Sequence, residues 1–246
     1  MLWRVRATKD FPSWPDFVTA FVSCLLIINL QVYSILGMEP EPADVPIQDR
    51  RVRRSKAALI KATIMLVGER GTAAVPVSDI AEAANVSRPV VYQHFGDRDN
   101  LLLEAAIDLA TRELLPGMAD AAGSPTRRDG ALTLVKHFAE HRAFYRAVLT
   151  SSCAFALNKS LTALLMPINR QLVQEVFGPA LEPEAADDYA AFITGGGAAL
   201  VNTWIIEGAE PLDPEAFADR LMRIPPFVSD LLRMPGTPQH DKEPVR

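Results

Sequence analysis

The sequence has few of the residues on which several protein classes depend. Only two of its 246 residues are cysteine, Cys24 and Cys153, which excludes a disulfide-stapled scaffold and a zinc module built on cysteine. Four histidines leave little material for a histidine-rich metal site. The hydrophobic share of 49% and the charged share of 22% are ordinary for a folded protein, so wholesale disorder is not expected. The length suits one large domain or two modest ones.

The chain also lacks an overall positive charge. Its formal net charge is −5, and an acidic protein as a whole repels the phosphates of nucleic acid. The charge is unevenly distributed, however: residues 50–96 carry a net charge of +5, whereas residues 1–49 and 97–246 carry −3 and −7. On charge alone, an anionic partner for the basic stretch and an ordinary solvated helix start explain this pattern about equally well.

The N-terminal segment differs in character from the rest. Residues 17–37 form an uncharged run that is long and apolar enough to cross a membrane, and a secretory signal is a second interpretation, although no cleavage site follows. A third interpretation is that Met38 is the native start and that residues 1–37 are upstream sequence translated in frame. We favour the third because the composition changes abruptly at Met38. A single membrane anchor and a buried or interfacial helix are the alternatives.

From residue 50 onward, apolar residues recur at every third or fourth position, and the alternation typical of strands does not occur. The pattern predicts an all-α protein. Helices are expected over residues 51–70, 77–84, 88–95 and 98–115, then, after a linker over 116–130, over 131–149, 154–177, 183–207 and 214–233. Pro167 should kink the helix that contains it, and the Pro225–Pro226 pair should break the last helix.

Capping and turn residues mark the shorter helices. Gly71 suits a left-handed stop after the first helix, and Pro76 stands where a first helical residue would. Asn85 tolerates the left-handed region between the next two helices. Ser87 and Asp97 are the expected N-caps of the helices that follow them. Two helices joined by a tight turn, with a third behind them, predict a helix-turn-helix.

Four short strings carry a resemblance to a known family. They are ATIMLVGERG at residues 62–71, DIAEAANVS at 79–87, VYQHF at 91–95 and RDNL at 98–101. In this order and spacing they resemble the DNA-binding domain of TetR-family (tetracycline-repressor-like) transcriptional regulators. The match covers about 50 residues, and the remaining helices fit the family in number and length only. The resemblance implies an all-α homodimer that usually releases its DNA when a small apolar effector binds the C-terminal bundle.

The resemblance divides the chain into four parts. We expect an N-terminal extension over residues 1–49, a three-helix helix-turn-helix DNA-binding domain over 50–112, a helical ligand-binding and dimerisation domain over 113–233, and a disordered tail over 234–246. Such a regulator would work in the bacterial cytoplasm, associated with the nucleoid, and would meet a membrane only if residues 17–37 are translated in the native protein.

Three residues depart from the family pattern. Pro76 stands where the family usually has a hydroxyl that caps the second helix and touches phosphate. Asn85 replaces the customary glycine of the turn, and Val90 lacks a hydroxyl that many members use for a backbone contact. None of these changes threatens the fold, but together they would reduce the number of phosphate contacts.

The helix expected over residues 88–95 would read the DNA bases. A helix in the major groove reads base edges only with its outward-facing residues. Burying Val91 and Phe95 turns four other residues outward, namely Arg88, Pro89, Tyr92 and Gln93. Arg88 can hold guanine O6 and N7 with two hydrogen bonds, and Gln93 can pair with adenine. Pro89 and the Tyr92 ring can contact a thymine methyl group, unless Tyr92 is a core aromatic.

Other residues are candidates for contacts to the DNA phosphates. They are Ser87, His94, Arg98, Arg51, Arg53 and Arg54. The first three resemble the family's phosphate contacts, although His94 as an ordinary surface histidine is the alternative. Arg98 stands in a first helical turn, which is a poor position for a cation unless it serves a phosphate. The arginines of residues 50–54 form an arm that could follow the backbone or enter the minor groove.

The expected bundle gives weaker signals. Candidates for the effector pocket are Phe138, Phe155, Leu164, Met166 and Trp204, although an apolar residue of a bundle helix is more often plain core. His137 and His141 share a helix face, but the sequence shows no third ligand, so we expect no metal and no cofactor. Small residues around 190–207 and leucines within 217–232 favour a dimer interface there, in which two copies pack as a four-helix bundle.

The favoured function is a sequence-specific, homodimeric DNA-binding transcriptional regulator, a repressor rather than an activator. A small-molecule effector would release it from a palindromic operator of double-stranded DNA. The competing hypothesis is an all-α enzyme or small-molecule-binding protein whose helix-turn-helix is incidental. An enzyme needs a catalytic constellation, and the sequence has no HExxH motif, no aspartate-rich metal motif and no nucleophile elbow, so we expect none. A membrane-tethered regulator would differ from the favoured one only in residues 17–37.

Overall fold

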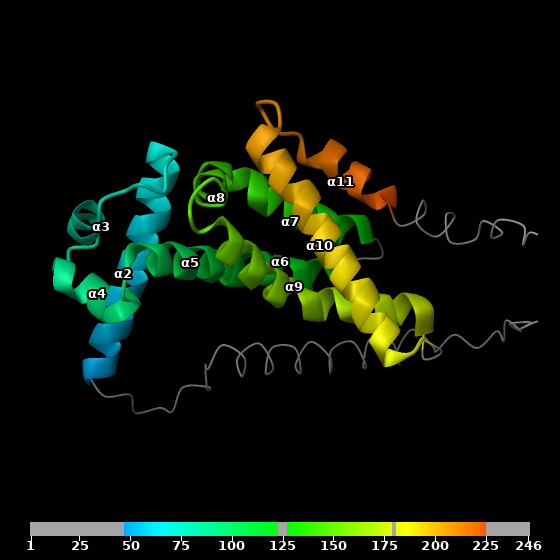
Figure 1. Cartoon of the computed structure of the whole chain (residues 1–246), viewed down its shortest axis with the longest axis horizontal. Coiled ribbons are helices and arrows are strands. Elements are labelled where there is room, and N and C mark those ends of the chain that lie inside the picture. The colour runs from blue at the N-terminus through cyan, green and yellow to red at the C-terminus, as the bar shows by residue number, and fades with distance from the viewer. Residues whose placement is uncertain (1–46, 123–126, 179–180, 225–246) are drawn as a thin grey trace, which may run out of the picture. The chain divides into compact units, whose positions relative to one another are not determined.

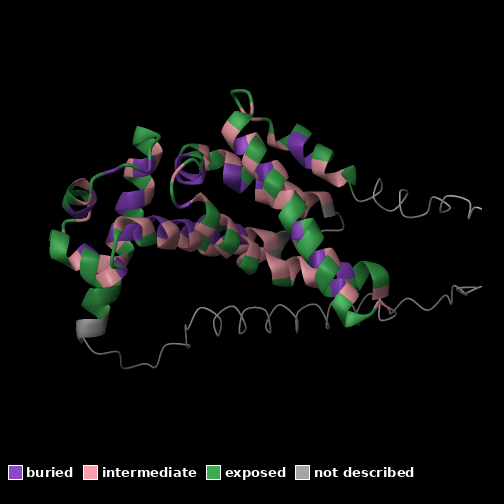
Figure 2. Ribbon diagram, viewed as in Figure 1, coloured by how far each residue is buried: buried purple, intermediate pink, exposed green. Residues whose placement is uncertain are grey.

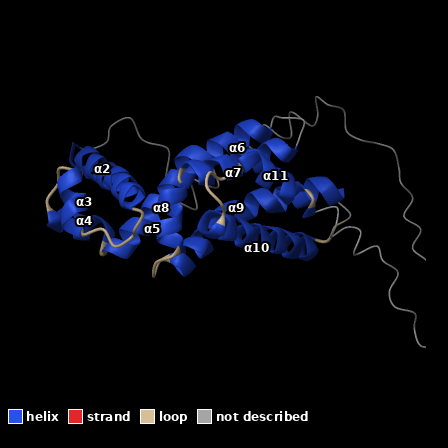
Figure 3. Ribbon diagram, turned by 90° about the horizontal axis from the view of Figure 1, so that it is seen from above, coloured by secondary structure: helices blue, strands red, loops and turns tan. Residues whose placement is uncertain are grey.

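The computed structural model describes residues 47–122, 127–178 and 181–224. The described residues from 51 onward form one compact unit, and of the preceding unit only residues 47–50, the start of a helix, are described. Every regular element in the described residues is helical (Figures 1 and 3). The all-α prediction is therefore confirmed for this part of the chain, and the expectations for residues 1–46 and 234–246 lie outside it.

The first helices follow the local signals of the sequence. They are α2 (Ile47–Arg70), α3 (Val77–Ala83), α4 (Arg88–Phe95) and α5 (Arg98–Leu109). Gly71 has a φ of 61°, and Asn85, between α3 and α4, has a φ of 53°, so both adopt the left-handed conformation that their positions predict. Pro76 is the N-cap of α3 rather than its first helical residue. At the other end of this connection, the Arg70 guanidinium lies 2.7 Å from the Asp79 carboxylate and ties α3 to the end of α2.

A shared apolar cluster holds α3 and α4 in place. Ile80 and Val91 are fully buried and Phe95 nearly so, in the same cluster as Leu59 of α2 and Leu101 of α5. Burial of whole aliphatic and aromatic side chains contributes about 1.5–3 kcal/mol each. On α3 the second buried residue is Ala81, whereas Ala84 is only half-buried because the helix has already ended.

Helices occupy the described part of the linker expected over residues 116–130, of which residues 123–126 lie outside the described residues. After α5 a π-helical turn, η1 (Ala110–Leu114), leads into α6 (Leu115–Ala122), and α7 begins at Arg127. In the π turn the Leu115 N–H donates to the Ala110 carbonyl, so the hydrogen-bond register has already changed before Pro116. Pro116 then lies in the first turn of α6, where its missing N–H costs little. The expected linker was wrong because proline does not stop a helix at that position. The domain boundary expected at residue 112 falls inside this π turn and stays a prediction.

The remaining helices form the second part of the unit. They are α7 (Arg127–Glu140), α8 (Arg142–Leu149), α9 (Ala154–Phe177), α10 (Pro183–Glu207) and α11 (Pro214–Met222). The bounds of α9 and α10 are those expected, and the two helices lie side by side (Figure 1). The single helix expected over 131–149 is two helices, because the chain leaves the helical path at His141. The last helix ends at Met222, well short of residue 233, and the Pro225–Pro226 pair lies outside the described residues.

Arg142, the first residue of α8, binds the chain that follows α10. Its guanidinium donates to the Ile205 carbonyl at 3.0 Å, to the Gly208 carbonyl at 2.6 Å and to the Glu210 carboxylate at 2.9 Å. Two of these acceptors are carbonyls at the C-terminal end of α10, which a helix leaves without partners of its own. The charge also suits the negative end of the helix dipole. Arg142 therefore fixes the end of α10 against α8.

α10 is less buried than its apolar composition suggests. It is a helix long and apolar enough to cross a membrane by length and composition, and 22% of its most apolar window is buried. Figure 2 shows exposed residues along much of its length. A Cβ added at Gly195, Gly196 or Gly197 would meet nothing within 4 Å in the described structure. No other described helix therefore packs closely against these glycines.

Candidate DNA-binding surface

The outward face of α4 is composed as the sequence predicts. Val91 and Phe95 are buried at 0% and 4% exposure. The four candidates for base contacts are all exposed: Arg88, Pro89, Tyr92 and Gln93. Tyr92 retains 43% of its exposure, so it is not a core aromatic. α4 thus presents one polar and aromatic face to solvent while its opposite face anchors it in the core.

Arg88 and Tyr92 interact with each other on this face. The Arg88 guanidinium donates to the Tyr92 hydroxyl at 3.1 Å, and its central carbon lies 5.7 Å from the centroid of the tyrosine ring. The two residues are one helical turn apart, which is the spacing at which side chains meet on a helix surface. The pairing holds the guanidinium over the exposed face of α4 without burying its charge.

His94 lies at the edge of the face and is held by α2. Its Nε2 atom is 2.8 Å from the Ser55 hydroxyl oxygen, and that hydroxyl donates to the Val52 carbonyl at 2.9 Å. Since serine has a single hydroxyl proton, the His94 Nε2 atom is the donor in this pair. His94 is half-buried, not a fully exposed surface histidine. The sequence did not reveal Ser55 as its partner, because the two residues belong to different helices.

Ser87 and Asp97 occupy the expected N-cap positions but behave differently. The Asp97 carboxylate accepts from the Asn100 backbone N–H at 2.7 Å, which completes the cap of α5. Ser87 stands at the N-cap of α4, is exposed, and makes no capping hydrogen bond. The predicted cap at Ser87 is therefore right in position and wrong in its hydrogen bond.

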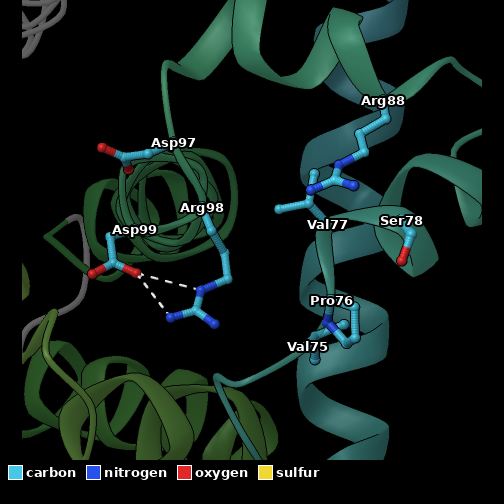
Figure 4. A pocket seen from close by; sticks show the side chains of 8 residues that line it. All are labelled: Val75, Pro76, Val77, Ser78, Arg88, Asp97, Arg98 and Asp99. Atoms are coloured by element: carbon cyan, nitrogen blue, oxygen red, sulfur yellow. Dashed lines mark hydrogen bonds and ion pairs between the residues drawn. The ribbon is translucent and has the colours of Figure 1, made fainter.

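Arg98 and Arg88 line a common cleft of about 550 Å³ (Figure 4). Arg98 is the first residue of α5, and its guanidinium lies 3.3 Å from the Asp99 carboxylate. Ser152, in the loop before α9, donates to the same carboxylate at 2.8 Å. The Ser152 hydroxyl and then Arg98 hold the pKa of Asp99 below its usual range. Asp99 thus connects a candidate phosphate contact with a loop of the bundle.

The remaining phosphate candidates lie at the start of α2. Arg51, Arg53 and Arg54 are all exposed and occupy its first two turns. The structure therefore places them on the same helix that holds His94 through Ser55.

The candidates for the effector pocket have different surroundings. Phe138 is buried, with its ring centroid 4.7 Å from that of Tyr145. Trp204 is stacked on Phe217 of α11, with centroids 4.3 Å apart. Leu164 and Met166 are half-buried on α9, and the Met166 sulfur lies 3.8 Å from the Thr194 hydroxyl.

Phe155 differs from the other four candidates for the effector pocket. It is 82% exposed at the start of α9, so it does not line the interior of a single protomer. The hydrophobicity of its side chain gave no information on which way the helix would turn it. Neither the cleft of Figure 4 nor the second cleft, which Arg142 and Arg146 line, contains any of the five candidates.

The two histidines of the bundle have a neighbour that the sequence did not show. His141 Nε2 lies 2.7 Å from a carboxylate oxygen of Glu113, which belongs to the π turn. His137 is buried, and its Nε2 atom lies 2.9 Å from the Tyr145 hydroxyl. Burial, and to a lesser extent His141, lowers the pKa of His137 from 6.5 to about 4. Burial also raises the pKa of the Tyr145 hydroxyl.

Comparison with known proteins identifies the family. The sequence profile of "Bacterial regulatory proteins, tetR family" matches residues 59–105, and that of "Transcriptional regulator C-terminal region" matches residues 126–225. The HTH-type transcriptional regulator BetI of Burkholderia thailandensis is 31% identical over 159 residues, which is 59% of this chain and 80% of the relative. The chain belongs to the TetR family. It is therefore a DNA-binding transcriptional regulator and not an enzyme, and the competing hypothesis of an incidental helix-turn-helix is wrong.

Further members of the TetR family resemble the chain over different lengths. The BetI of Rhizobium meliloti is 33% identical over 110 residues, 44% of this chain and 48% of that relative. The crystal structure of a putative TetR-family transcriptional regulator from Rhodococcus sp. has a TM-score of 0.51 at 20% identity and covers 70% of this chain and 97% of that chain. This structural likeness shows that the two TetR-family proteins share a fold.

Proposed function

We propose that the chain is a homodimeric repressor that binds a palindromic operator through α4 and leaves it when a small apolar effector binds the helical bundle. TetR-family regulators bind DNA operators and act as dimers with small-molecule effectors. The observation that carries the proposal for this chain is the exposed Arg88–Tyr92 face of α4, which stands above the buried Val91 and Phe95.

The base contacts come from that face. The Arg88 guanidinium can grip guanine O6 and N7 once it turns from Tyr92 toward the groove, because their hydrogen bond is exposed and readily exchanged. Gln93 reaches an adenine, and Pro89 and the Tyr92 ring supply apolar contact to a thymine methyl group. These four side chains would decide which operator sequence the regulator prefers.

The phosphate contacts surround the same face. The uncapped hydroxyl of Ser87, the guanidinium of Arg98 and the ring of His94 border α4, and the exposed arginines of the α2 start lie on the helix that holds His94. Arg98 exchanges its contact with the Asp99 carboxylate for a phosphate. Contacts of this kind set the register of a protein on DNA and carry no sequence information.

The dimer interface uses α10 and α11. Phe192 and Ile193 of α10 are 65% and 41% exposed, next to three glycines that nothing in the described protomer covers. Exposed large apolar side chains beside small residues support burial against a second copy.

We place the effector site in the helical bundle and the protein in the cytoplasm. Phe138, Leu164, Met166 and Trp204 are the residues proposed to meet a small apolar effector. Bacterial regulators of this type are soluble proteins of the cytoplasm, where we place this one. A membrane-tethered form requires translation of residues 17–37, which the structure does not describe.

Fluorescence anisotropy with DNA from the upstream region of the protein's own gene tests the proposal. We expect binding that weakens steeply with salt, by about 0.9 in the logarithm of affinity per logarithm of salt for each phosphate contacted. Arg88→Ala should lower the affinity about tenfold to a hundredfold, because one bidentate base contact contributes about 1–3 kcal/mol. Arg146→Ala, which removes the same charge from the exposed surface of α8, is the matched control.

Two results would contradict the proposal. DNA binding that is absent or independent of salt would exclude the operator function. Equal losses of DNA affinity in Arg88→Ala and Arg146→Ala would show that Arg88 of α4 makes no specific contact with the bases. Circular dichroism on both variants shows that the helices are intact.

A further inference from the structure

Three side chains that could bind a metal converge away from the DNA-binding surface. Glu113 comes from the π turn η1, His137 from the last turn of α7, and His141 from the break between α7 and α8. One ligand atom from each lies within 4.8 Å of the other two. We propose that these three residues bind one divalent transition-metal ion of the Zn²⁺ class per protomer. The sequence showed only the histidine pair, and the fold supplies the third ligand.

The donor set favours this class of ion. Two imidazole nitrogens and one carboxylate oxygen suit Zn²⁺ and similar ions, whereas Mg²⁺ and Ca²⁺ prefer oxygen ligands alone. Three protein ligands leave a fourth position for water or another ligand. No thiolate is required, which agrees with a chain that has cysteine only at Cys24 and Cys153.

A small movement converts the present contacts into coordination. Tetrahedral bonds of about 2.1 Å place ligand atoms about 3.4 Å apart. The Glu113 and His141 atoms are 2.7 Å apart and would separate slightly to admit the ion between them. The side chains of Glu113 and His141 are 44% and 25% exposed, so they can adjust and also leave a path from solvent.

His137, the buried ligand of the proposed site, is already held in place by its neighbours. His137 is 6% exposed, its Nε2 atom lies 2.9 Å from the Tyr145 hydroxyl, and its ring meets that of Phe138 edge to face at 5.4 Å. Hydrogen bonds and packing around a ligand histidine fix its orientation and typically raise metal affinity. A site with one fixed and two adjustable ligands needs little reorganisation to bind an ion.

The π turn presents Glu113 to the histidines. π turns inside α-helices are rare and occur frequently at functional sites. The same turn leaves the Thr111 hydroxyl oxygen buried without a hydrogen-bond partner among the described residues. This hydroxyl is a second irregular feature of the turn. The unusual turn, the orphaned hydroxyl and the convergence of ligands therefore occur at one place.

Calorimetric titration of the untagged, full-length, chelator-treated protein with ZnCl₂ tests the site. We expect one ion per protomer, and we expect Glu113→Gln and His141→Gln each to weaken binding by about tenfold to a hundredfold or more, since even a lost second-shell partner costs that much. Glu140→Gln and His94→Gln are the matched controls. Each makes the same chemical change outside the cluster and should leave the affinity for Zn²⁺ unchanged. His137 is left out of this titration because replacing a buried side chain would change the packing of the site together with its ligand set.

Titration with Co²⁺ gives an independent readout. The wild-type protein should develop the visible absorption bands of a bound Co²⁺ ion, and both cluster variants should lose them while circular dichroism shows an unchanged helical fold. The proposal is overturned by an absence of stoichiometric binding to the wild type, by unchanged affinity in both cluster variants, or by an equal loss in the controls. The measurement involves no DNA, so its result is separate from the operator-binding test.

Discussion

The His94 imidazole of α4 donates its Nε2 proton to the Ser55 hydroxyl of α2 across 2.8 Å. The Ser55 hydroxyl in turn donates a hydrogen bond to the Val52 carbonyl, so the C-terminal end of α4 is joined through one side chain to the backbone of α2. The orientation of α4 relative to the exposed arginines of α2 depends in part on this chain of two hydrogen bonds.

Ser55→Ala breaks that connection. The half-buried His94 ring loses its partner, so we expect the free energy of unfolding in urea to fall by about 1 kcal/mol. Operator affinity should fall while the dependence of affinity on salt keeps its slope, because no phosphate contact is removed. Ser78→Ala on α3, whose hydroxyl binds only the neighbouring Asp79, is the control. Equal stability of wild type and Ser55→Ala would mean that this hydrogen bond contributes nothing to the free energy of unfolding.

Asp97→Ala and Ser87→Ala should differ although both residues are N-caps. Only Asp97 makes the capping hydrogen bond, so its replacement should lower the free energy of unfolding by about 1 kcal/mol, and Ser87→Ala should lower it by less than half of that. Asp97→Ser should recover most of the loss, since serine is also a good N-cap. Urea denaturation followed by circular dichroism measures all three, and a Ser87→Ala loss as large as that of Asp97→Ala would contradict the structure.

Arg142→Ala should destabilise the protein more than most substitutions near its surface. Its side chain is only 13% exposed and satisfies two carbonyls at the end of α10, so we expect a loss of about 2–4 kcal/mol in the free energy of unfolding. Glu210→Gln removes only the exposed ion pair and should cost less than about 1 kcal/mol. If both variants unfold at the same urea concentration, the carbonyl contacts of Arg142 contribute nothing.

His137 should make the metal-free protein sensitive to mild acid. Its pKa is about 4 in the folded chain and 6.5 when unfolded, so the unfolded state binds more protons between these values. The stability due to the neutral imidazole is complete above pH 6.5 and is lost as pH falls toward 4, by up to about 3 kcal/mol. Urea denaturation across this range in the presence of chelator should show a shallower pH dependence for His137→Gln. Identical curves for His137→Gln and wild type would contradict the lowered pKa of His137.

The parts of the fold that the sequence predicted are those with local causes. The bounds of α4 were correct because Ser87, Pro89 and Gly96 mark its ends and Val91 and Phe95 set its buried face. α9 and α10 were also placed correctly, from apolar periodicity between strong terminators. The outward face of α4 followed from the same periodicity, since burial of one side of a helix fixes which residues remain on the other.

The parts that the sequence missed depend on contacts between distant residues. The break at His141 coincides with its hydrogen bond to Glu113, and no pattern within either helix records that pairing. Ser55 was not expected beside His94 for the same reason. Phe138 of α7 and Phe155 of α9 are the same residue type, and only the packing of their two helices decides that the first is buried and the second exposed.

The π turn also decides what the chain can lose at one place. Its hydrogen bonds span five residues instead of four, so it holds about one residue more per turn than an α-helix. The wider turn absorbs this extra residue, and the helix that follows keeps nearly the direction that a continuous α-helix would give it. Deleting one residue from Ala110–Leu114 would therefore allow one uninterrupted α-helix from α5 into α6 that still packs on α7. The loss would fall on the side chains of the turn itself, Glu113 among them, and not on the packing of the bundle.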